Sequence, residues 1–398
     1  GGFEHAFDKS LTASSGSLSF VRDTKRHALW IGPDQYHPAQ DGADMRFSID
    51  LVVQEFCERR LQQAVLENNA GGGRLIVADC TTGEILAMCD TLRPREGWDE
   101  FSTDTLRAKH PSLGRNRCVT DPYEPGSTFK PFVWAQATEL GYARPDEILD
   151  TPEHTGYRTS KGRLIRDSHY YGKVSWRTVL VKSLNSGMAI VAERMSFQEL
   201  ENTVDLFGFG RRTFCGIPGE TTGIITPKDK WTHYTQTSVP MGHEIGVTAV
   251  QMVRAFSVFA RDGTMPTLRI TAASPASDHY RAIHRILSEH TVHVAREAMR
   301  EVMTDGTGRR AQSELYQLFG KSGTPQLPKK DGSGYHEDRY MPSFIAGAPY
   351  EDPQIVVLCI IDDPDKKIAH YGGAVAGPVV RDVIDHTLQY LGVPSDVV

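Results

Sequence analysis

The strand-like segments most constrain the fold of this chain, because they lie near the two ends of the sequence and leave a largely helical middle. Two apolar runs, residues 74–80 and 85–89, are separated by Thr-Thr-Gly-Glu and predict a β-hairpin. Three more runs, residues 317–324, 343–348 and 354–361, come near the end. We expect strands from both ends to join one sheet with helices on both faces. That is an α+β fold rather than a series of β-α-β units.

Apolar residues at helical spacing predict helices in the middle and at the end of the chain. The first begins after Asp50, whose side chain can cap it, and places Val53, Cys57 and Leu61 on one face. The other expected helices cover residues 127–139, 176–182, a segment from the break at 183–186 to about 195, 248–261, 291–304 and 373–391.

Residues 1–45 differ from the rest, with Gly, Asp, His and Pro in a loose pattern. Short strand-like pieces at residues 18–21 and 28–31 predict a small β-rich appendage. The start of the chain reads like the middle of a longer protein, and no apolar run approaches the roughly 20 residues that span a bilayer. We therefore expect that a membrane anchor has been removed.

Composition excludes several kinds of function. A net charge of −6 without a basic stripe makes nucleic acid an unexpected partner. The six cysteines form no Cys-x-x-Cys pair and sit mostly among apolar residues, which predicts buried thiols. His290 and His293 are helix-spaced, but no His-Glu-x-x-His pattern is present, so we expect no metal and no cofactor.

Ser127 and Lys130 form the first chemical motif, Ser-Thr-Phe-Lys, at the start of an expected helix. A spacing of three residues puts both side chains on one helical face. A serine hydroxyl becomes a good nucleophile when a base takes its proton, and a buried lysine can be that base. The helix N-terminus adds N–H groups that suit an oxyanion. The pattern alone leaves open that Ser127 only caps the helix and that Lys130 is solvated.

Ser183 and Asn185 form the second motif, at the break between two helices. A hydroxyl there can relay a proton toward a leaving group, and an amide side chain can hold a substrate peptide bond. Both residues are also common in ordinary loops, so this motif by itself does not identify a site.

The third motif, Lys321-Ser322-Gly323-Thr324, lies on an expected edge strand. Such a strand can accept a substrate peptide as an added strand, and Gly323 would let a ligand approach the backbone. Lys321 supplies positive charge, while Ser322 and Thr324 supply hydroxyl groups for a carboxylate. Alone, the motif could be a strand end; the three motifs in this order are far more specific.

With these motifs, the chain resembles a class B (monofunctional) penicillin-binding protein over most of residues 45–395, nearer the division type than the elongation type. The matching stretches include VADCTTGEILAM, CVTDPYEPGSTFKPF, VKSLNSGMAIVAERM and GKSGTP. The resemblance implies a transpeptidase fold, with a central antiparallel sheet and helices on both faces, for residues 46–398. It implies that residues 1–45 are the remnant of an N-terminal pedestal.

The resemblance also implies roles for the motif residues. Ser127 would attack the carbonyl between two terminal D-alanines, and Lys130 would accept its proton. Ser183 would help pass a proton to the departing D-alanine, while Asn185 contacts the substrate amide and Lys130. Lys321 would set the local potential and complete this network.

Substrate binding is implied for the rest of the third motif. Ser322 and Thr324 would bind the terminal carboxylate of the peptide. Backbone N–H groups of Ser127 and Thr324 would form the oxyanion hole. His243 lies where the family has a loop near the active-site cleft; it could line the cleft or be an ordinary polar loop residue.

An enzyme of this kind is a peptidoglycan D,D-transpeptidase that crosslinks stem peptides ending in D-Ala-D-Ala and is inhibited by β-lactams. The resemblance places it on the outer face of the cytoplasmic membrane, beside glycosyltransferase and divisome proteins. One alternative is a class D β-lactamase or β-lactam sensor domain, although their middle motif resembles Ser-x-Val where this chain has Asn185. The other is a non-catalytic scaffold for cell-division proteins.

Overall fold

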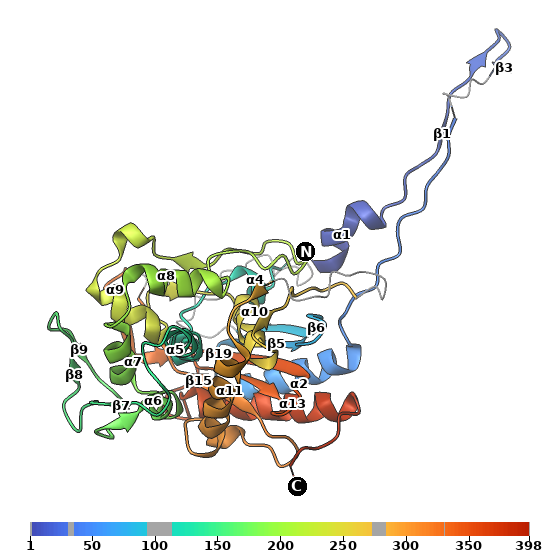
Figure 1. Cartoon of the computed structure of the whole chain (residues 1–398). Helices are drawn as coiled ribbons and strands as arrows, with labels where there is room; N and C mark the ends of the chain where they lie inside the picture. The colour runs from blue at the N-terminus through green and yellow to red at the C-terminus, as the bar shows by residue number, and fades with distance from the viewer. Residues whose placement is uncertain (1, 31–35, 94–113, 273–283, 330, 398) are drawn as a thin grey trace.

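The computed structural model describes residues 2–30, 36–93, 114–272, 284–329 and 331–397. Its centre is a five-stranded antiparallel sheet in the order β15-β18-β19-β5-β6 (Figure 1). The C-terminal part of the chain therefore pairs with the first quarter, as the sequence predicts, and β15 lies at the edge. The strands are β5 (Gly72–Asp79), β6 (Ile85–Leu92), β15 (Phe319–Gly323), β18 (Ser343–Ala348) and β19 (Ile355–Asp362).

Alternate side chains of the strands face two helical layers, which confirms the expected α+β architecture. Leu75 and Val77 pack in one core with α2 (Leu51–Glu67) and α13 (Gly377–Tyr390). Ile76 and Ala78 point to the opposite face. There they join a larger core that includes residues of α5 (Lys130–Glu139), α10 (Ala249–Ala260) and α11 (Glu289–Thr304).

Most of the remaining elements are short. Residues 196–247 hold elements that the sequence pattern does not reveal, because short helices and strands show little periodicity. The elements outside the central sheet and its main helices are α4 (Arg117–Thr120), η3 (Gly126–Phe129), β7 (Ile148–Leu149), β8 (Tyr157–Arg158), β9 (Leu164–Ile165), β10 (Val174–Ser175), α6 (Trp176–Lys182), α7 (Asn185–Ala192), α8 (Phe197–Leu206), β11 (Ile224–Ile225), η4 (Lys228–Lys230), α9 (His233–Ser238), η5 (Val239–Met241), β12 (Ile245–Gly246), β13 (Thr264–Met265), β14 (His284–Arg285), η7 (Arg309–Ala311), β16 (Gln326–Pro328), β17 (Tyr335–Tyr340) and α12 (Gly372–Val375).

Two expected helices differ from the structure. The last one is divided into α12 and α13, because Pro378 lies in the first turn of α13 and cannot continue a helix from before it. The one expected from Ser127 begins instead with the 3₁₀ turn η3 and becomes α-helical at Lys130. This difference matters for the site, since it places Ser127 in a tight turn.

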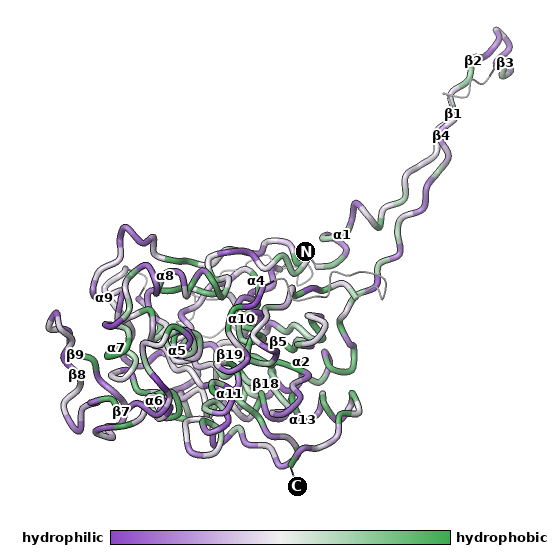
Figure 2. The backbone as a smooth tube through the Cα atoms, viewed as in Figure 1, coloured by the Kyte–Doolittle hydropathy of each residue, from purple (hydrophilic) through white to green (hydrophobic). Residues whose placement is uncertain are grey.

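The N-terminal segment forms an arm that leaves the main body (Figures 1 and 2). It contains the short ladders β1 (Ser17–Leu18) with β4 (Tyr36–His37), and β2 (Val21–Arg22) with β3 (Ala28–Trp30). Short strands are present there as expected, and a helix that was not expected, α1 (Gly2–Leu11), precedes them. Phe3 of α1 stacks on Phe47, with ring centroids 4.4 Å apart.

A buried ion network joins the sheet to the segment that leads into η3. Arg117 of α4 lies 2.7 Å from Asp362 of β19 and 2.8 Å from Asp90 of β6, and Arg74 of β5 lies 3.0 Å from Asp362. Burial opposes ionisation of Asp362, but the charges of Arg117 and Arg74 prevail and lower the pKa of this carboxyl. The network fixes α4, and so the start of the nucleophile turn, against three strands.

In the described part of the chain, all six cysteines are buried free thiols, as expected. No helix among the described residues is long and apolar enough to cross a bilayer.

Candidate active site

Ser127 lies in the turn η3, half-buried, at the centre of a cavity of about 760 Å³. Gly126 makes the turn possible: its φ is +55°, and a Cβ there would lie 3.0 Å from Pro325. The alternative that Ser127 caps a helix is not supported, since neither η3 nor α5 has a side-chain cap. No hydrogen bond joins its Oγ to any other described residue, so this hydroxyl is free to meet a ligand.

Lys130 is fully buried one turn beyond Ser127. Its Nζ donates to the Ser183 carbonyl at 2.6 Å and to Asn185 Oδ1 at 2.7 Å, and it lies 3.3 Å from Ser183 Oγ. Burial lowers the pKa of Lys130 to about 7, although the nearby charge of Asp167 acts in the opposite direction. A large fraction of Lys130 is therefore the free amine near neutral pH, which is what a base requires. The alternative of a solvated lysine is wrong.

Ser183 caps the end of α6 in the left-handed conformation, with φ +62°, and turns the chain into α7. This turn brings its hydroxyl between two lysines. Lys321 Nζ lies 2.9 Å from Ser183 Oγ, the same oxygen that Lys130 Nζ contacts. Burial and the charge of Lys130 lower the pKa of Lys321 well below its ordinary value. The three groups form a chain along which a proton can move.

Asp167 was not singled out from the sequence, yet it holds the second motif in place. Its carboxylate accepts the backbone N–H of Asn185, the backbone N–H of Ser186 (3.1 Å) and the Ser186 hydroxyl. The Asn185 side chain is fixed at its other end, donating to the Arg166 carbonyl at 3.0 Å. A carboxylate at a helix N-terminus is stabilising, but nothing local in the sequence shows that residue 167 meets the start of α7.

Two residues of the third motif line the cavity, Ser322 near the end of β15 and Thr324 just after it. Ser322 Oγ lies 2.6 Å from Thr307 Oγ1, and Thr324 Oγ1 accepts the N–H of Gly372 at 3.0 Å. Gly323 does not line the cavity: a Cβ there would lie 2.7 Å from the Pro125 carbonyl. The absence of a side chain at Gly323 lets β15 pack against the segment that leads into the nucleophile turn. That Gly323 also lets a ligand approach the backbone stays a prediction.

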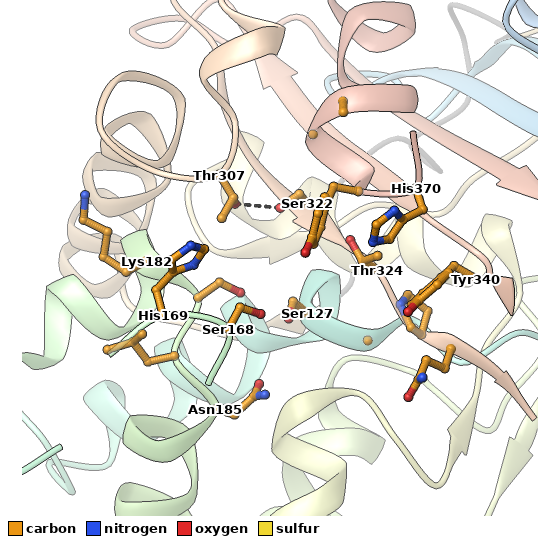
Figure 3. Close-up of a pocket in the computed structure, with 18 of the residues that line it drawn as sticks. Ser127, Ser168, His169, Lys182, Asn185, Thr307, Ser322, Thr324, Tyr340 and His370 are labelled. Carbon is orange, nitrogen blue, oxygen red and sulfur yellow. Dashed lines mark hydrogen bonds between the residues drawn. The ribbon is translucent and has the colours of Figure 1, made fainter. Parts of the chain in front are cut away.

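Figure 3 shows how these side chains surround the cavity. Ser127 lies between two hydroxyl groups on one side, those of Ser322 on β15 and of Thr324 just after it, and Asn185 on the other side. Lys182 and His169 lie on one side of the cavity, and Tyr340 and His370 lie on the other. Arg309, Arg310 and Tyr371 also line it.

The structure thus brings together Ser127, Lys130, Ser183, Asn185, Lys321, Ser322 and Thr324, which come from three separate parts of the sequence. His243 also lines the cavity, so of the two expectations for this residue the structure supports a place in the cleft. Among the described residues, no group of three or more His, Cys, Asp or Glu side chains is arranged to hold a metal ion.

This fold and cavity agree with a family match. Residues 73–385 match the penicillin binding protein transpeptidase domain, and the chain belongs to that family. Stage V sporulation protein D of Bacillus subtilis is 32% identical to it over 405 residues, which cover 98% of this chain and 60% of the relative. A probable peptidoglycan D,D-transpeptidase, PenA of Neisseria flavescens, is 29% identical, covering 98% of this chain and 94% of the relative. The chain thus spans about 60% of the length of the first of these relatives.

Solved structures show the same fold. The apo transpeptidase domain of penicillin-binding protein 3 from Burkholderia pseudomallei has a TM-score of 0.77 and 30% identity, covering 88% of this chain and 98% of that one. Penicillin-binding protein 3 from Mycobacterium tuberculosis, complexed with aztreonam, has a TM-score of 0.78 and 26% identity, covering 95% of this chain and 89% of that one.

Proposed function

We propose that this chain is a peptidoglycan D,D-transpeptidase that works through an acyl-enzyme on Ser127. One observation carries the proposal. Ser183 Oγ lies within 3.3 Å of Lys130 Nζ and 2.9 Å of Lys321 Nζ, directly beside the cavity that Ser127 lines. A free hydroxyl next to a relay of buried amines suits acyl transfer, in which a proton leaves the nucleophile and reaches a leaving amine.

The mechanism begins with a peptide ending in D-Ala-D-Ala along β15, its carboxylate at Ser322 and Thr324. Lys130 takes the proton of Ser127 as Oγ attacks the carbonyl carbon. The proton passes through Ser183 to the nitrogen of the leaving D-alanine. An amine of a second stem peptide then takes the acyl group. The name of PenA, a probable peptidoglycan D,D-transpeptidase, and the aztreonam complex of the Mycobacterium tuberculosis protein support the same assignment here.

Covalent labelling tests this proposal. We expect fluorescent penicillin to label the purified chain and Ser127→Ala to abolish the label. Ser168→Ala is the matched control, because Ser168 also lines the cavity but lies outside the turn η3 that carries Ser127. Labelling that survives Ser127→Ala would refute Ser127 as the nucleophile. A wild-type chain that takes no label would favour the alternative of a non-catalytic scaffold. Rapid release of hydrolysed penicillin would favour the β-lactamase alternative.

The wider setting is part of the same proposal. We place the domain on the outer face of the cytoplasmic membrane, nearer septal division than elongation, with a glycosyltransferase and divisome proteins as partners. Residues 1–45 would be the end of a pedestal and residues 46–398 the catalytic domain. Exposed apolar residues on the arm, including Leu18, Val21 and Leu29, support a protein contact there.

A further inference from the structure

A carboxylate three residues before the nucleophile joins three separate segments at the edge of the cavity. Glu124 Oε2 lies 2.9 Å from His243 Nδ1. Glu124 Oε1 accepts the backbone N–H of Glu244 and the hydroxyl of Tyr335, both at 2.9 Å. The side chain of Glu124 is only 16% exposed, so these contacts fix its position. The mechanism above uses none of these groups.

The loop that carries His243 lies against the backbone of the nucleophile turn. Gly126 N–H donates to the Gly242 carbonyl at 3.0 Å. A Cβ on Gly242 would lie 2.1 Å from the Gly126 carbonyl oxygen, so the two segments are in direct contact. His243 follows Gly242 and Ser127 follows Gly126, and both line the same cavity. The imidazole is 33% exposed, so it can meet a ligand there.

The contact with Glu124 also decides which ring nitrogen is available. Since a carboxylate only accepts hydrogen bonds, Nδ1 of His243 carries the hydrogen that faces Glu124. In the neutral ring, Nε2 then carries a lone pair. No described residue makes a hydrogen bond to Nε2, so this lone pair is free to accept a proton.

Acidic side chains and an aromatic ring surround His243. Glu124 and Glu244 supply negative charge beside it, and Tyr335 packs edge-on against it, with ring centroids 5.7 Å apart. Burial and the charge of Glu124 raise the pKa of Tyr335 above its ordinary range, so its hydroxyl stays protonated and donates to Glu124. Arg163 is a cation that interacts with both Glu244 and Tyr335 of this cluster.

The second half of the proposed reaction needs a base that the lysine relay does not supply. The acceptor amine arrives as an ammonium ion, which has no lone pair. One of its protons must leave before attack, and another must return to Ser127 during attack. Lys130 and Ser183 account for the second proton, because they reverse the route used in acylation.

We propose that His243, oriented by Glu124, is the general base that removes the first proton from the acceptor ammonium. This inference rests on the proposed function and assigns the transfer step to a group distinct from the acylation relay. The Glu124–His243 pair has the geometry of a carboxylate-oriented imidazole base.

The ammonium gives a proton to Nε2, leaving a neutral amine and an imidazolium paired with Glu124. The amine nitrogen forms a bond to the acyl carbon, the bond from that carbon to Ser127 Oγ breaks, and the second amine proton passes through Ser183 and Lys130 to Oγ. The imidazolium then releases its proton to water.

Two acceptors of different basicity test the proposal. The acyl-enzyme is formed from a D-alanyl thioester donor and partitioned between water and either D-methionine, which is an ammonium ion at neutral pH, or hydroxylamine, which is already neutral. For His243→Asn we expect transfer to D-methionine to fall at least ~10-fold, while transfer to hydroxylamine changes less than about 2-fold. We expect labelling by fluorescent penicillin to be unchanged.

His243→Asn is chosen because its amide can still donate to Glu124 and keep the loop in place. Tyr335→Phe, which removes one contact of Glu124 and no base, is the structural control and should leave both transfers near the wild-type rates. Equal losses with both acceptors, or no loss with D-methionine, would overturn the proposal. Loss of penicillin labelling in the wild type would instead overturn the proposed function.

Discussion

Replacement of Asp167 tests whether this single carboxylate both positions the second motif and sets the protonation of Lys130. Asp167 accepts three hydrogen bonds from Asn185 and Ser186, and its charge raises the pKa of Lys130 against the larger effect of burial. The two roles can be separated. Alanine removes both, while asparagine keeps an acceptor oxygen and removes only the charge.

The expected magnitudes follow from these contacts. Hydrogen bonds to a charged group contribute roughly 1.5–3 kcal/mol each, but water can replace part of them at this half-buried site. We therefore expect Asp167→Ala to cost about 2–4 kcal/mol of unfolding free energy. A displacement of Asn185 and Ser183 by about 1 Å should slow acylation about 100-fold. Asp167→Asn should slow acylation less than about 10-fold at its own optimal pH.

The pH dependence has a definite sign. The negative charge of Asp167 stabilises the ammonium form of Lys130, so its loss must move the pKa of Lys130 below about 7. The free amine then becomes available at lower pH. We expect the midpoint of the acylation rate to move to lower pH in Asp167→Asn.

Stopped-flow acylation by a chromogenic cephalosporin, measured from about pH 5 to pH 9, provides the assay. Asp146→Asn is the control, because Asp146 is 81% exposed and does not line the cavity. A midpoint that stays fixed or rises in Asp167→Asn would refute the electrostatic argument. Acylation by Asp167→Ala at the wild-type rate would refute the positioning argument.

Three further substitutions test the surroundings of the site. Gly242→Ala should cost about 3 kcal/mol or more in urea unfolding and reduce penicillin labelling, because its Cβ would overlap Gly126, whereas Gly141→Ala, also at positive φ but in open space, should cost about 1–2 kcal/mol and leave labelling unchanged. Arg117→Met should lower the free energy of unfolding by about 3–5 kcal/mol, since it leaves two buried carboxylates without this partner; a loss below 1 kcal/mol would contradict the network. Thr307→Val should raise KM for a thioester substrate about five-fold through the loss of about 1 kcal/mol, with kcat unchanged; a fall in kcat alone would argue against carboxylate binding.

The sequence predicts the main features of this domain because they depend on local patterns. Alternation and apolar runs locate the five central strands, and helical spacing locates α2, α10 and α11. The three motifs are short and ordered, so Ser127, Lys130, Ser183, Asn185 and Lys321 can be selected without a structure. The missed elements include α1, which has no buried residues, and the six-residue α9, whose periodicity is too brief to detect.

Other features depend on contacts between distant segments, and only the tertiary structure decides them. The sequence predicts that Lys130 and Lys321 take part in the chemistry of the site. Only packing brings both amines to the hydroxyl of Ser183 and removes both from water. Asp167 contacts Asn185 because the loop that carries Asp167 packs against the start of α7. Glu124 meets His243 across 119 residues for the same reason. Hydrophobic patterns determine which faces are buried, whereas the pairing of polar atoms follows from how those faces pack.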